Sequence, residues 1–174
     1  MSIRYAAYGS NLHPVRLRAR LPAAELLGTA RLDGWSLEFH KRGRDGSGKC
    51  SVQPGGNGVS LAVYALSRRE LAALDAIEGV GMGYQRHVVK LPLYGACHTY
   101  IAEASHVDDS LAPFDWYREL VVLGAEHHAF DTSYIDRLAT VAAASDPDRD
   151  RHAEHWALIQ RIDPARRPAL RDAP

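Results

Sequence analysis

The chain has 174 residues, 46% of them hydrophobic and 24% charged, with 21 basic residues balanced by 21 acidic ones. This length suits one soluble domain with a full core, and a formal charge of zero argues against nucleic acid as the main partner, because nucleic-acid-binding proteins carry a basic field. The N-terminus lacks the apolar run of a signal peptide and no segment nears the roughly 18 apolar residues of a membrane helix, so we expect a cytoplasmic protein without membrane partners.

The first half of the chain is predicted to consist mainly of strands. Residues 3–8 read as a short buried strand that stops at the turn Gly9-Ser10-Asn11. A short helix is expected in HPVRLRARL, with Asn11 as its N-cap and Pro14 in its first turn. Further strands are predicted near 25–32, 35–41, 59–66, 86–93 and 97–102.

The best-marked helix begins after Ser67. In SRRE, the Ser67 hydroxyl and the Glu70 carboxylate form a capping box, and Gly79 supplies the stop. Later helices are predicted over 115–126, 133–144 and 151–162.

Strands therefore come first and helices gather late, which is typical of an α+β fold with a mixed, mostly antiparallel sheet or barrel and flanking helices. We expect one domain over 1–145 and a C-terminal helix over 146–162 that packs on it. Residues 163–174 hold three prolines and no strong apolar pattern, which predicts a flexible tail.

The stretch GRDGSGKC, from Gly43 to Cys50, nearly spells the phosphate loop of nucleotide-binding proteins. Cys50 stands where that motif needs Ser or Thr for magnesium, and the glycine- and proline-containing segment that follows has no helical period. We interpret it as a glycine-rich connection between two strands.

No metal site is expected. The two cysteines, Cys50 and Cys97, do not have the spacing of metal ligands, and neither does the EHH of 126–128.

Glu78 is the candidate acid. It lies on the same face of the capped helix as Leu71 and Leu74, so it is carried toward apolar surroundings in the last helical turn. Desolvation and the negative end of the helix dipole both disfavour its charge, so it could exchange a proton near neutral pH. Two alternatives stay open: Glu78 bends into solvent at a frayed helix end, or Asp75 is the functional acid.

Three segments together resemble the γ-glutamylcyclotransferase family of the AIG2-like superfamily. They are YAAYGSNL at 5–12, LDAIEGV at 74–80 and WYRELVVLGAE at 116–126, and the resemblance covers roughly residues 3–142. It implies the family's fold, an enzyme that works without a cofactor, and a small-molecule γ-glutamyl substrate.

The resemblance also implies roles for particular residues. Glu78 would be the catalytic acid and base, and a loop would cradle the γ-glutamyl group through its backbone N–H groups. The implied substrate-binding residues are Tyr8, Gly9, Ser10, Asn11, Leu12, Tyr84, Tyr100 and Tyr117.

The reaction implied is intramolecular aminolysis, in which the α-amino group of a γ-glutamyl amine or amino acid attacks its own γ-carbonyl and releases 5-oxoproline and an amine. Two alternatives remain: a binding module without catalysis, and a cyclotransferase that acts on a γ-glutamylamine or a γ-glutamylated biosynthetic intermediate. The sequence is compatible with a monomer or a homodimer.

Overall fold

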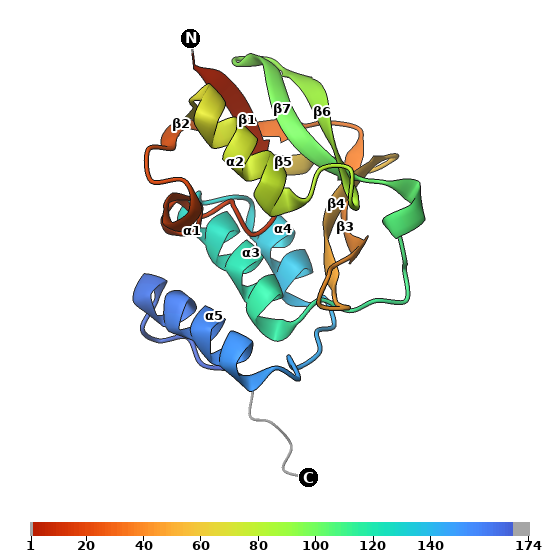
Figure 1. The fold of residues 1–174 in the computed structure, drawn as a ribbon, viewed down its shortest axis with the longest axis vertical. Helices are drawn as coiled ribbons and strands as arrows, with labels where there is room; N and C mark the ends of the chain where they lie inside the picture. The colour runs from red at the N-terminus through yellow and green to blue at the C-terminus, as the bar shows by residue number, and fades with distance from the viewer. Residues whose placement is uncertain (1, 169–174) are drawn as a thin grey trace.

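The computed structural model of the protein describes residues 2–168 and has the predicted α+β architecture (Figure 1). The strands occupy the first part of the chain and three of the helices follow them, as the element order predicted. Within residues 2–168, no helix combines the length and apolar character that crossing a membrane would need.

The main sheet is open and has five strands in the order β2-β5-β1-β7-β6. β1 (Ile3–Ala7) pairs antiparallel with β5 and parallel with β7, and the remaining pairs are antiparallel. The sheet is therefore mixed and mostly antiparallel, as expected. The other four strands are β2 (Glu25–Leu32), β5 (Val59–Leu66), β6 (Tyr84–Leu91) and β7 (Gly95–Ala102).

A second, two-stranded sheet joins β3 (Trp35–Arg42) and β4 (Gly48–Pro54). β4 was not predicted, because its sequence, GKCSVQP, has glycine and proline at its ends and no alternation of apolar residues. Burial on both faces explains it: Cys50, Ser51 and Val52 are all buried. The Ser51 hydroxyl accepts a hydrogen bond from the Ala102 N–H at 2.9 Å, which ties β4 to β7.

Two helices flank the strands in the first half of the chain. α2 (Arg68–Glu78) has the predicted capping box at Ser67 and Glu70, and it ends at Gly79 in the left-handed conformation. α1 (Pro14–Arg20) has Pro14 in its first turn, but its N-cap is His13 rather than Asn11. The prediction of Asn11 as the cap was wrong because the Asn11 side chain is engaged by Glu78 at the end of α2 and by Arg20 at the far end of α1.

Of the three late helices, the last two both pack on the first, α3 (Asp115–His127). α3 is buried on nearly every face, as its continuous apolar run requires. α4 (Thr132–Ala139) is shorter than predicted and ends before Ala142, which was expected on its apolar face. α5 (Arg149–Ile162) packs against α3 on the side away from the sheet (Figure 1).

The stretch predicted as a flexible tail covers 163–174, of which the structure describes 163–168. There, the Arg166 guanidinium pairs with Glu119 at 2.7 Å and also with Glu126, both on α3. The remainder of the predicted tail, 169–174, lies outside the described residues.

One buried carboxylate fastens α5 to α3. Asp146 is 0% exposed, and it accepts two hydrogen bonds from the Arg151 guanidinium at 2.6 and 2.7 Å and one from the Trp116 indole at 2.8 Å. Burial opposes the charge of Asp146, but the hydrogen bonds from Arg151 and Trp116 outweigh it and lower the pKa of Asp146 to about 2.

We expect Asp146→Asn to lower the free energy of unfolding by about 3 kcal/mol at pH 7. This is the low end of the usual cost of breaking a buried ion pair, because Arg151 keeps partial access to water. The folded pKa lies below the ordinary value of 3.8, so this contribution is present above pH 4 and is lost as the pH falls toward 2. Urea unfolding at several pH values measures it, with the exposed Asp150→Asn as control. A gap between wild type and Asp146→Asn that stays constant from pH 5 to 2 would contradict the assignment.

Candidate active site

Glu78 lies at the junction of two neighbouring cavities. The inner chamber holds about 30 Å³ and the outer chamber about 230 Å³, and Glu78, Ser10, Tyr84 and Tyr117 line both. Besides these four, the inner chamber is lined by Tyr5, Tyr8, Gly9, Asn11, Cys50 and Tyr100. The outer chamber is lined also by Arg20, Lys41, Gly43, Arg44, Asp45, Lys49, Ile77 and Met82.

The structure thus gathers Glu78 with all but one of the residues that the family resemblance implied. They come from the loop after β1, from the end of α2, from β6 and β7, and from α3. These segments are far apart in the chain, and the packing of α3 and the two sheets brings them to one place. The rival acid, Asp75, lines neither chamber; it pairs with Arg86 at 2.6 Å and accepts from the Tyr100 hydroxyl at 2.8 Å.

The Glu78 carboxylate is held by Asn11. The Asn11 amide donates to Glu78 Oε1 at 3.0 Å and to the Tyr5 hydroxyl at 3.2 Å, while its oxygen accepts from Arg20 at 3.1 Å. Arg20 also lies 3.5 Å from Glu78 Oε1. The carboxylate therefore points into the site with a fixed orientation, and it does not bend freely into solvent as the alternative interpretation held.

The loop beside the inner chamber presents backbone donors. Within residues 2–168, the N–H groups of Gly9, Ser10 and Asn11 donate to no protein acceptor. Consecutive N–H groups that face a cavity form a site for a carboxylate or an oxyanion. The inner chamber is large enough for one such group, since a single water needs roughly 10–15 Å³ of comparable volume.

Position 9 requires glycine because neighbouring residues approach its Cα closely, and not because of its backbone angles. A Cβ built there would lie 3.0 Å from the Cβ of Cys50 and 3.4 Å from the Tyr117 hydroxyl. The loop therefore packs directly on β4 and α3, and this contact fixes the position of its backbone.

The tyrosines form the walls of the inner chamber. The Tyr84 hydroxyl donates to the Cys50 carbonyl at 2.6 Å, the Tyr117 hydroxyl accepts from the Cys50 N–H at 3.1 Å, and the Tyr8 hydroxyl donates to the Tyr100 carbonyl. Burial raises the pKa of Tyr8, Tyr84 and Tyr117 well above the ordinary value. These hydroxyls stay protonated at neutral pH and act as fixed hydrogen-bonding groups.

Leu12 is the implied site residue that lines neither chamber. Its side chain is fully buried, and its carbonyl accepts from the Tyr64 hydroxyl at 2.6 Å and from His128 at 2.8 Å. A Cβ on Gly124 would lie 2.4 Å from the Leu12 Cβ, so α3 passes very close to this point. Leu12 anchors the loop to the core.

Sequence reasoning missed several residues of the site. In the inner chamber these are Tyr5, which precedes the recognised loop, and Cys50, the last residue of the sequence that resembles a phosphate loop. Burial raises the pKa of the Cys50 thiol to about 12, which makes it a wall residue rather than a nucleophile. Sequence reasoning also missed the basic residues of the outer chamber: Lys41, Arg44 and Lys49 lie in the β3–β4 hairpin, and only the fold brings Arg20 of α1 beside them.

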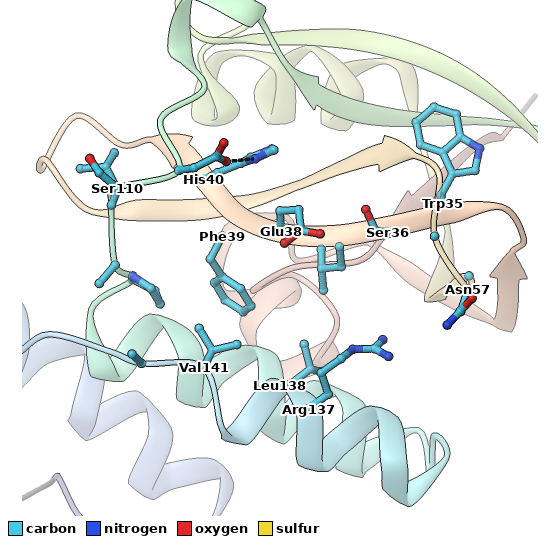
Figure 2. A pocket seen from close by; sticks show the side chains of 18 residues that line it. Trp35, Ser36, Glu38, Phe39, His40, Asn57, Ser110, Arg137, Leu138 and Val141 are labelled. Atoms are coloured by element: carbon cyan, nitrogen blue, oxygen red, sulfur yellow. Dashed lines mark hydrogen bonds and ion pairs between the residues drawn. The ribbon is translucent and has the colours of Figure 1, made fainter.

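A larger cavity of about 790 Å³ lies between β3, α4 and residues 109–113. Figure 2 shows Phe39 from β3 pointing across this cavity toward Val141 and toward Leu138 of α4. Two other lining residues, His40 and Asp109, are hydrogen-bonded to each other at 3.0 Å. None of the residues implied as functional lines this cavity, so its size does not make it the active site.

Comparison with known proteins gives a consistent result. The family model described as gamma-glutamyl cyclotransferase, AIG2-like, matches residues 5–118. The gamma-glutamylcyclotransferases of Homo sapiens and Bos taurus are 28% and 27% identical over 151 and 148 residues, covering 80% of this chain and 79% of each relative. A solved structure called gamma-glutamyl cyclotransferase superposes with a TM-score of 0.80 at 25% identity, over 92% of this chain and 99% of that one.

We expect Gly9→Ala to destabilise the protein by about 1–3 kcal/mol, the usual cost of overpacking, because its methyl group would press on the Cys50 Cβ. Urea unfolding measures the change. In a Cys50→Gly background, which removes the opposing Cβ, the same substitution should cost less. Equal costs in both backgrounds would show that this contact does not position the loop.

Proposed function

The chain belongs to the gamma-glutamyl cyclotransferase, AIG2-like family, and on that premise we propose the reaction that it catalyses. The proposed enzyme converts a γ-glutamyl amine or γ-glutamyl-amino acid into 5-oxoproline and a free amine. Glu78 is its proposed general acid and base. The observation that carries the proposal is the position of the Glu78 carboxylate, which Asn11 orients at the junction of the two chambers.

In the proposed binding mode, the α-carboxylate of the γ-glutamyl group enters the inner chamber. The N–H groups of Gly9, Ser10 and Asn11 are its donors, and these groups have no acceptor within residues 2–168. The α-amino group and the γ-carbonyl then lie at the junction beside Glu78, and the leaving amine extends into the outer chamber. Holding a flexible substrate in this folded form brings the amine to the carbonyl, which is a proximity effect.

The reaction forms a bond from the α-amino nitrogen to the γ-carbonyl carbon and breaks the bond from that carbon to the amide nitrogen. Two protons leave the attacking ammonium nitrogen and two arrive on the departing nitrogen, so neither water nor a net proton is consumed. A carboxylate beside both nitrogens can accept the protons and return them, which is the role proposed for Glu78. Burial keeps the Cys50 thiol protonated, in line with a route that forms no covalent enzyme intermediate.

We expect Glu78→Gln to fold normally and to lower the rate of 5-oxoproline formation by about a hundred- to ten-thousand-fold, the usual contribution of general acid–base catalysis. The amide can still accept from Asn11 but cannot carry a proton between the two nitrogens. The assay incubates each protein with a panel of γ-glutamyl compounds and measures 5-oxoproline.

Glu70→Gln is the matched control. Glu70 is on the same helix as Glu78, it lines neither chamber, and glutamine also supports a capping box. Turnover by Glu78→Gln at the wild-type rate would remove Glu78 from the mechanism. No 5-oxoproline from the wild-type protein with any substrate would overturn the proposed reaction.

A further inference from the structure

The outer chamber carries more positive than negative charge. Four basic and two acidic side chains line it. Both acids are engaged by a basic partner: Glu78 lies 3.5 Å from Arg20, and Asp45 lies 2.7 Å from Lys49. The surplus of positive charge therefore rests on the two remaining basic residues, Lys41 and Arg44.

Lys41 and Arg44 form no ion pair within residues 2–168. The Lys41 ammonium lies 4.6 Å from the centre of the Tyr84 ring, and the Arg44 guanidinium reaches the Met82 sulfur at 3.8 Å. Burial lowers the pKa of Lys41; the charge of Glu78 opposes this shift, and neighbouring basic side chains, Arg44 among them, add to it. Two cations that have no carboxylate partner within residues 2–168 can bind the carboxylates of a ligand.

The local fold places both cations beside the loop that follows Glu78. A Cβ on Gly79 would lie 3.2 Å from Arg44 Nη2, and one on Gly83 would lie 3.0 Å from Lys41 Nζ. These two glycines flank the short loop that follows α2, so the chain directly after Glu78 leaves room for the two basic side chains. Arg44 itself lies in the turn between β3 and β4, within the sequence that resembles a phosphate loop.

A further buried cation adds to the positive electrostatic potential of the outer chamber. Arg16 on α1 is 8% exposed, and its Nε has no hydrogen-bond partner within residues 2–168. Burial, reinforced by repulsion from Arg20, lowers the pKa of Arg16 to about 10, while Tyr117 and Glu78 are close enough to oppose the shift. Arg16 therefore stays charged at neutral pH and contributes positive potential near the outer chamber.

We propose that the outer chamber selects γ-glutamyl compounds whose leaving amine is an acidic amino acid, glutamate or aspartate, and that Lys41 and Arg44 determine this preference. The inference rests on the proposed function and narrows it to one class of substrate. Because the α-carboxylate of the γ-glutamyl group is assigned to the loop N–H groups, the two carboxylates of an acidic leaving amino acid remain for the two unpaired cations. A neutral leaving amino acid supplies one carboxylate, and an alkylamine supplies none.

The test compares γ-glutamyl-glutamate with γ-glutamyl-glutamine, which has the same shape and lacks the second charge. We expect kcat/KM for 5-oxoproline formation to be about tenfold higher for γ-glutamyl-glutamate, the factor for one charge-assisted contact. Arg44→Gln should lower kcat/KM for γ-glutamyl-glutamate by about tenfold and leave γ-glutamyl-glutamine nearly unchanged. Arg44 is exposed, so the variant should fold.

Arg42→Gln is the matched control, because Arg42 is on the same hairpin, pairs with Asp108 at 2.9 Å and does not line the outer chamber. It should leave the preference intact. Equal or faster turnover of γ-glutamyl-glutamine by the wild-type protein would overturn the inference while supporting the proposed function. No 5-oxoproline from either compound or from an uncharged γ-glutamylamine would overturn the proposed function itself.

Discussion

A single side-chain amide holds the parts of this site together. Asn11 donates to Glu78 and Tyr5 and accepts from Arg20, so it joins the loop after β1 to the ends of α1 and α2. The amide uses both its donor and acceptor capacity in a buried position, where an unsatisfied polar group would be costly. The orientation of the carboxylate and the position of the loop therefore depend on each other.

Dense packing supports this network from behind. The loop is confined between β4 and α3, since Gly9 touches Cys50 and Gly124 allows α3 to approach Leu12. The hydroxyls of Tyr84 and Tyr117 form hydrogen bonds with the backbone of Cys50, so these side chains hold β4 in place as well as line the cavity. Pre-organised backbone donors can stabilise charge without a large reorganisation of the protein, which suits a reaction whose carbonyl oxygen gains negative charge.

The electrostatics divide the site into two regions with different tasks. In the inner chamber the described polar groups are backbone N–H groups, hydroxyls, one amide and Glu78, whereas the outer chamber is rich in cations. In the proposed mechanism the first region serves the part that every substrate shares and the second serves the leaving group. Relatives that differ in the sequence of the β3–β4 turn or of the loop after α2 would then differ in their preference for the leaving group. The residues around Glu78 and the inner chamber would be the same.

The sequence by itself determined the elements whose signals are local. The capping box at Ser67 and the glycine stop at Gly79 define α2 to the residue, because caps are formed by neighbours three or four positions apart. The order of strands and helices predicted the fold class, and the motifs around residues 8–12 and Glu78 indicated the family. These features need no knowledge of distant contacts.

Tertiary structure alone decided the rest. β4 is a strand because both of its faces are buried, and α1 takes His13 as its cap because Glu78 and Arg20 engage Asn11. The basic outer chamber is assembled from α1, the β3–β4 hairpin and the loop after α2, which no spacing in the sequence relates to one another. Local patterns specify hydrogen bonds along the chain, whereas a site lined from several elements depends on how those elements pack.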